Sequence, residues 1–230
     1  LSGNMVVDIV EDKNQHLWVS TWSNGLNKFD PATETFEHFT PDFAGDGSTS
    51  GMSVVALHTP DILAVSKGSQ LALLHMNKEH MNKEHMNKGD MNEQRWQTID
   101  LPNTADSTVI YTTVTDSKGK LWIATTGSGL YQYDPDTKTI IQFKHDPDDP
   151  NTLSSNNIYA LIEDDAGELW IGTEFGPNKF NPQSGTINRK VLAQLANVEV
   201  DWMFKDGNGH IWIAEDDKYI TRYVPQLDAA

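Results

Sequence analysis

A run of histidine and methionine residues is the densest group of possible metal ligands in this sequence. The pentapeptide His-Met-Asn-Lys-Glu is repeated with near identity, and then decays, across residues 75–94. Thioether and imidazole groups together suit soft ions such as Cu(I), so Met76, His80, Met81 and His85 are candidate ligands. A five-residue period fits neither helix nor strand, and the run is equally typical of a polar low-complexity insertion. We therefore expect no metal or cofactor and keep Cu(I) as the alternative.

A second group of side chains combines aromatic rings with amides, hydroxyls and carboxylates, which are the groups that bind sugars and peptides. Its members stand where matching repeats of the chain, described below, carry different residues. They are Trp22, Asn24, Tyr111, Ser128, Asn157, Tyr159, Glu174, Phe175, Asp201 and Trp202. Such a position either contacts a ligand or faces solvent, and for Trp22 and Phe175 packing against a neighbouring repeat is a further alternative.

A repeated motif must position these side chains. In each copy an Asp lies six residues before a Trp, and the four aspartates are Asp12, Asp116, Asp164 and Asp206. Asp with Gly or Asn is typical of a tight turn, and the Leu/Ile-Trp-Ile/Val run after it is typical of a strand. We predict a hairpin in which the Asp has a structural role. Apolar residues two and six positions before the Asp are expected to share one core face.

The repeats predict an all-β fold of the β-propeller type. Each repeat offers four short antiparallel strands over 40–50 residues, which matches a propeller blade. A β-sandwich would not repeat its strand signatures with this period. We predict one propeller domain over 1–230, with the 75–94 insertion in its second blade. Its five blades are expected at 1–41, 49–102, 107–145, 153–189 and 197–225.

The ends of this array predict a larger ring. The first blade starts with its innermost strand, and the fifth shows no convincing fourth strand. An open sheet edge leaves hydrogen-bonding groups exposed. We therefore expect the five blades to be part of a larger ring within a longer protein.

Composition excludes several functions. The net charge of −16 argues against nucleic-acid partners and against contact with an anionic membrane. There is no cysteine, so disulfides, thiolate metal sites and a cysteine nucleophile are absent. No apolar run reaches the roughly 18 residues that a membrane helix requires.

One segment carries a family resemblance. The run from Leu153 to Asp164, followed by Gly167-Glu168-Leu169-Trp170-Ile171-Gly172-Thr173, resembles the two-component regulator propeller repeat. The resemblance implies a periplasmic sensor ectodomain of a bacterial hybrid histidine kinase or diguanylate cyclase. It marks the blade structure and leaves the ligand open.

Three functions remain in view. The leading hypothesis is a non-catalytic sensor that binds a small molecule such as an oligosaccharide or peptide, and that self-associates or contacts neighbouring signalling domains. The alternative is an enzyme, because the segment from Gly207 to Glu215 also resembles blades of streptogramin lyases. Those enzymes need a His/Glu/metal centre, which the histidine positions here do not assemble. A passive interaction scaffold is the third reading.

Overall fold

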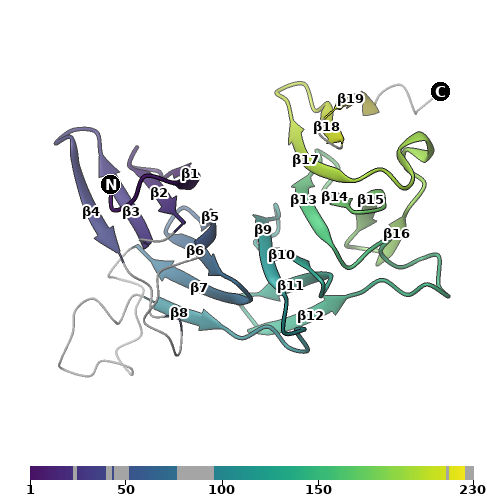
Figure 1. The fold of residues 1–230 in the computed structure, drawn as a ribbon, viewed down its shortest axis with the longest axis horizontal. Helices are drawn as coiled ribbons and strands as arrows, with labels where there is room; N and C mark the ends of the chain where they lie inside the picture. Colours follow the sequence, from purple (N-terminus) through teal and green to yellow (C-terminus); the bar gives the residue numbers. More distant parts are fainter. Residues whose placement is uncertain (23–24, 40–42, 44–51, 77–95, 216–217, 226–230) are drawn as a thin grey trace. The chain divides into compact units, whose positions relative to one another are not determined.

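The chain folds into β-strands with one short 3-10 turn at Ala193–Leu195 in the residues that the structure describes. The structure is a computed structural model that describes residues 1–22, 25–39, 43, 52–76, 96–215 and 218–225. These residues form two compact units, Leu1–Leu101 and Pro102–Ala230. Each unit consists of small antiparallel sheets (Figure 1). The predicted all-β propeller fold, with five blades, is confirmed.

The first unit contains two four-stranded blades, each with its strands in sequence order. Blade 1 comprises β1 (Val6–Glu11), β2 (Leu17–Thr21), β3 (Gly25–Asp30) and β4 (Thr35–Phe39). Blade 2 comprises β5 (Met52–Thr59), β6 (Ile62–Lys67), β7 (Gln70–His75) and β8 (Trp96–Ile99). The repetitive insertion therefore joins β7 to β8.

The second unit contains three blades. Blade 3 comprises β9 (Val109–Thr115), β10 (Leu121–Thr126), β11 (Leu130–Asp134) and β12 (Thr139–Phe143). Blade 4 comprises β13 (Ile158–Glu163), β14 (Leu169–Thr173), β15 (Gly176–Asn181) and β16 (Thr186–Asn188). Blade 5 comprises β17 (Val200–Lys205), β18 (Ile211–Glu215) and β19 (Tyr219–Tyr223), and its described residues form no fourth strand.

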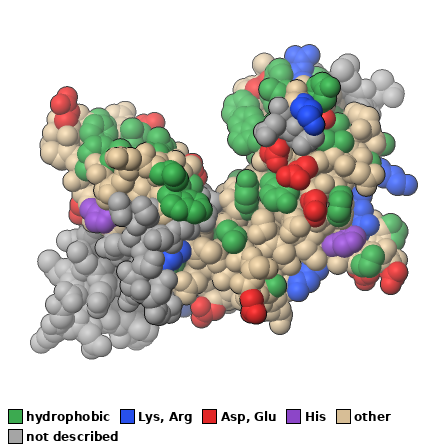
Figure 2. Space-filling model, viewed as in Figure 1, with side chains coloured by type: hydrophobic (Ala, Val, Ile, Leu, Met, Phe, Trp, Pro, Cys, Tyr) green, Lys and Arg blue, Asp and Glu red, His purple; other side chains and the backbone are tan. Residues whose placement is uncertain are grey.

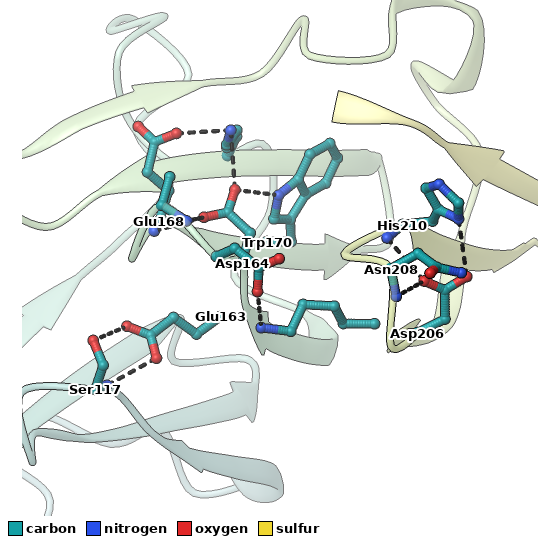
Figure 3. A network of polar contacts seen from close by, with 12 residues as sticks. Ser117, Glu163, Asp164, Glu168, Trp170, Asp206, Asn208 and His210 are labelled. Atoms are coloured by element: carbon teal, nitrogen blue, oxygen red, sulfur yellow. Dashed lines mark hydrogen bonds and ion pairs between the residues drawn. The ribbon is translucent and has the colours of Figure 1, made fainter. Parts of the chain in front are cut away.

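The predicted hairpin is held by its aspartate. In blade 4, Asp164 Oδ1 accepts the backbone N–H groups of Ala166 and Glu168, each at 3.0 Å. Its Oδ2 accepts the indole N–H of Trp170 at 3.1 Å (Figure 3). The same three bonds recur in blades 1, 3 and 5, which explains the fixed spacing of six residues. The left-handed turn residue is Gly in three copies, and Gln15 adopts it in the first.

The Trp strand of blade 4 is packed between the sheets of blades 3 and 5. We call the face of a blade that carries the Trp its trailing face, and the opposite face its leading face. In unit 2, Trp122 of blade 3 lies among Leu161, Leu169 and Phe180 from the leading face of blade 4. Trp170 of blade 4 lies in the same way against blade 5. The core is thus a stack of trailing-to-leading contacts.

The prediction that two apolar rows of the first strands share one core face is wrong. Positions two and six before the turn Asp lie on opposite faces of the blade, because one residue between them interrupts the pairing. In blade 4, Ile158 pairs with Thr173 and Ala160 with Gly172, so Tyr159 has no counterpart on β14. Such a β-bulge reverses the alternation of side chains from that point. Ile158 consequently shares the leading face with Leu161, and Ile162 shares the trailing face with Trp170.

Candidate ligand-binding site

Every blade has a bulge at the same place in its first strand. The residue left out of the register lies five positions before the turn Asp in blades 1, 3, 4 and 5, and blade 2 has an equivalent interruption. These residues are Val7, Ser53, Tyr111, Tyr159 and Asp201. Bulges redirect a side chain and are frequent near functional sites. The bulge residues of the blades thus share one backbone position and carry different side chains.

Three members of this row come together in unit 2. Their strands β9, β13 and β17 are successive neighbours (Figure 1). The rings of Tyr111 and Tyr159 meet edge to face, with centroids 5.3 Å apart and planes at 72°. Tyr111 is 46% exposed, and Tyr159 and Asp201 are partly exposed. A ligand can therefore reach both rings and the carboxylate.

Three carboxylates act on the Tyr159 hydroxyl through their charge. Burial raises the pKa of Tyr159, and the negative charges of Glu199, Glu174 and Asp201 raise it further, together with Tyr111. In the part of Figure 2 that shows unit 2, acidic side chains lie beside hydrophobic ones. No Lys or Arg of the described chain forms an ion pair with Glu174 or Asp201. Glu174 and Asp201 therefore bring negative charge that no Lys or Arg of the described residues pairs with.

Glu174 is held in place by the chain before β13. Its Oε2 accepts the side-chain N–H of Asn157 at 2.9 Å and the hydroxyl of Ser155 at 3.2 Å. The Asn157 Oδ1 in turn accepts the backbone N–H of Gly127 at 2.8 Å, in the loop between β10 and β11. Loops of blades 3 and 4 are thereby tied together beside the tyrosine pair. This network fixes the Glu174 carboxylate in one orientation.

The structure thus groups five of the ten predicted residues, namely Tyr111, Asn157, Tyr159, Glu174 and Asp201. We call them, together with Glu199, the bulge cluster. The sequence pattern does not single out Glu199, although it occupies the same row of the repeat as Asn157. Glu199 belongs to the cluster because of the bulge at Asp201, and only the pairing of the strands reveals that bulge.

The other predicted residues have no described contact with this cluster or have a different role. Ser128 is 1% exposed, and its hydroxyl pairs with that of Thr108 at 2.6 Å and accepts the backbone N–H of Ala105. Trp22 and Phe175 are exposed on loops, and Trp202 is exposed on the trailing face of blade 5. Asn24 lies outside the described residues. The hydrogen bonds of Ser128 with Thr108 and Ala105 give Ser128 a structural role in blade 3.

Metal-binding groups do not gather in the described residues. No set of three His, Asp or Glu side chains there has the geometry to hold an ion. Met76 packs against the core of unit 1, beside Trp18 and Leu74. His80, Met81 and His85 lie outside the described residues, so the Cu(I) alternative stays a prediction. The bulge cluster offers a ligand two aromatic rings and the hydrogen-bonded carboxylate of Glu174.

Comparison with known families agrees with the repeat architecture. The family model described as "Two component regulator propeller" matches residues 1–23 and 152–175. Two segments of the chain thus match the two-component regulator propeller repeat. Both matched segments span the first hairpin of a blade. In both, the Ser before that hairpin bonds a buried Asn of the third strand, Ser2 with Asn27 and Ser154 with Asn178.

Solved structures share the fold of this chain. The extracellular domain of a protein described as the hybrid two component system BT3049 from B. thetaiotaomicron is 19% identical, with a TM-score of 0.69. The match covers 96% of this chain and 27% of that domain. The corresponding domain of BT4673 is 18% identical with a TM-score of 0.52, and the match covers 97% of this chain and 34% of that one.

A propeller enzyme has a similar fold. Virginiamycin B lyase from Staphylococcus aureus is 14% identical with a TM-score of 0.65, over 94% of this chain and 65% of the lyase. At these identities the likeness establishes the fold alone. No curated protein matches the chain at a significant level. Within the described residues, no helix has the length and apolarity needed to cross a lipid bilayer.

Proposed function

We propose that this chain is the ligand-sensing propeller of an extracytoplasmic signalling receptor, and that it binds a ligand without converting it. The regulator propeller repeats support a place in a signalling receptor, and the extracellular origin of the BT3049 and BT4673 structures supports the location. The observation that carries ligand binding is the contact between Tyr111 and Tyr159 beside fixed carboxylates.

The chemistry of the bulge cluster favours a ligand with a cationic group. A cation over an aromatic face contributes about 0.5–2 kcal/mol, depending on how well it is desolvated. Glu174 and Asp201 supply charge that no described Lys or Arg pairs with. The sequence leaves oligosaccharides and peptides as ligand classes. The negative charge beside the tyrosine rings favours peptides with Lys or Arg side chains over uncharged oligosaccharides.

The test is a binding titration with short peptides of matched length that carry either Lys and Arg or Asp and Glu. The basic peptides should bind, with an affinity that falls as salt is added, because the attraction is electrostatic. Replacing Tyr111 by Ala, or Asp201 by Asn, should weaken binding about tenfold, which corresponds to about 1.4 kcal/mol.

A matched tyrosine substitution serves as the control. Tyr219 is 71% exposed on β19 and is not a member of the bulge cluster, so Tyr219→Ala should leave the affinity unchanged. If the cluster variants bind the basic peptides as well as the unsubstituted protein does, the proposed site is wrong. Binding of oligosaccharides that the same variants abolish would keep the site and change the ligand class.

A further inference from the structure

A pocket lies between blades 1 and 2, inside the first unit. Its volume is about 70 Å³, which is room for roughly five water-sized groups. Trp18 and Phe39 of blade 1 and Leu74 and Met76 of blade 2 form its apolar wall. Most of its other lining residues carry a charge. A concave apolar wall beside a few polar groups is typical of a small-molecule site.

The pocket exists because blade 2 covers the Trp of its neighbour with a smaller side chain. Between blades 3 and 4, Trp122 packs edge to face on the ring of Phe180, with centroids 5.5 Å apart. The strand register places Leu74 of blade 2 at the position of Phe180, and Leu74 lies in the same core cluster as Trp18. Leucine is smaller than phenylalanine, so space remains over the Trp18 ring.

The first hairpin of blade 2 widens this space. Only Pro60 and Asp61 stand between β5 and β6, whereas residues 164–168 stand between β13 and β14. Both residues of the short turn line the pocket. The longer turns of blades 3 and 4 meet, because the Glu163 carboxylate accepts the backbone N–H and the hydroxyl of Ser117, both at 2.8 Å (Figure 3). The short turn therefore leaves the pocket open at this end.

One cation of the pocket, Lys28, forms no ion pair within the described residues. The register places it at the position of Lys179 in blade 4. Lys179 pairs with the turn Asp at 3.0 Å and with Glu168 at 2.7 Å. In blade 1, His16 replaces that Glu, and its Nδ1 lies 3.1 Å from the turn Asp. The Lys28 ammonium lies 5.7 Å from the centre of the Trp18 ring and can receive an anion.

The opposite charge stands directly across the sheet. Glu37 on β4 is the cross-strand partner of Lys28 on β3, and it is exposed. Directly opposed residues place their Cβ atoms about 5 Å apart on one face of a sheet, yet these two side chains form no ion pair. The other two carboxylates of the pocket, Asp12 and Asp61, are already paired. The pocket thus offers one ammonium and one carboxylate beside an apolar wall.

We propose that this pocket binds a small free amino acid. The α-carboxylate of the ligand bonds to the Lys28 ammonium, and its α-ammonium bonds to the Glu37 carboxylate. Its apolar side chain lies against Leu74 and Met76. Such a ligand matches both charges, whereas a simple anion or a simple cation would leave one of them beside a like charge. The pocket shares no residue with the bulge cluster, so this site does not depend on the proposed function.

The test is an NMR titration of the whole chain with L-alanine. The indole N–H signal of Trp18, assigned by its loss in Trp18→Phe, should shift as the ligand is added, because this ring lines the pocket. The signal of Trp170, in the second unit, should stay fixed. Alanine amide lacks the carboxylate and N-acetylalanine lacks the ammonium, so each should bind about tenfold or more weakly than L-alanine.

Three variants test the residues of the pocket. Lys28→Gln and Glu37→Gln should each weaken L-alanine binding about tenfold. Leu74→Phe supplies the ring that covers the Trp in blade 4, so it should fill the pocket and abolish binding. Lys118→Gln, at an exposed Lys of blade 3, is the matched control and should leave binding unchanged. Circular dichroism checks that each variant is folded, and the two charge variants decide the test if Leu74→Phe is not.

The proposal is overturned if L-alanine shifts no Trp18 signal at any concentration up to its solubility limit. It is also overturned if alanine amide and N-acetylalanine bind as tightly as L-alanine, or if Lys28→Gln and Glu37→Gln both bind it as the unsubstituted chain does. Loss of basic-peptide binding at the bulge cluster would leave all of these results unchanged, so the two sites are tested separately.

Discussion

Replacing Asp164 by Ala should cost blade 4 much of its stability. The carboxylate accepts three N–H groups, two from the turn backbone and one from the indole of Trp170, and lies 3.0 Å from the ammonium of Lys179. Hydrogen bonds to a charged group contribute about 1.5–3 kcal/mol each, although bonds that share one acceptor group do not add fully. Alanine leaves the indole N–H of a fully buried ring without its acceptor.

The expected loss is about 3–4 kcal/mol, near the upper end for single substitutions. Lys179 limits the loss, because it keeps its second contact to Glu168 at 2.7 Å. The neighbouring Asp165 is the matched control. Its side chain is 72% exposed and makes one ion pair, with Lys205. Exposed pairs of this kind contribute at most about 1 kcal/mol, so Asp165→Ala should have a small effect.

Urea unfolding measures the total loss, and native-state hydrogen exchange locates it. The amides of Ala166 and Glu168 should exchange much faster in Asp164→Ala and keep their protection in Asp165→Ala. A double-mutant cycle with Trp170→Phe, which keeps an aromatic ring and removes the N–H, should give a coupling energy of about 1 kcal/mol or more. The reasoning is refuted if Asp164→Ala costs no more than Asp165→Ala, or if the coupling is zero.

Three other substitutions test the packing and electrostatics of unit 2. Gly172→Ala should destabilise the protein by about 1–3 kcal/mol in thermal unfolding, because a Cβ there would lie 2.7 Å from the Val200 side chain. Asn178→Ala should cost about 2–3 kcal/mol in urea unfolding, because this buried amide both accepts from and donates to Ser154. The hydrogen bond from Lys120 lowers the pKa of Asp134 to about 2, so the stability it contributes is present above pH 4 and is lost between about pH 4 and 2. Asp134→Asn should remove that part of the acid dependence of unfolding, and an unchanged pH profile would contradict it.

The blades could be predicted from sequence because their first hairpin has a fixed chemistry. The Asp bonds to the turn and to the indole have one geometry, so the spacing of Asp and Trp recurs at every copy. Strand alternation then places Leu121 and Trp122 on opposite faces, and both are fully buried. The hairpin and the alternation of its side chains depend on contacts within about ten residues of chain, which a sequence displays directly.

The bulge and the last trailing face could not be predicted in this way. A bulge adds one residue to a strand without a residue type of its own, since Val7, Tyr111 and Asp201 all occupy it. The repeat pattern also places Phe204, two residues before the turn Asp, in a row of residues expected to be buried. Phe204 is 49% exposed, because burial of that row depends on a neighbouring blade. Ser128 looks like a loop residue in sequence and is buried by the chain at Ala105 and Thr108.

The bulge also has a consequence for how this family of repeats can diversify. A residue that pairs with nothing across the sheet can be replaced without altering the register of its blade, whereas a change at Trp170 or Asp164 disturbs the whole hairpin. Each blade therefore has one site whose side chain does not set the register of the sheet. Gene copies that duplicate blades duplicate these sites as well. A propeller of this type can acquire a new specificity by drift along the row, one blade at a time, while its scaffold stays under constant selection.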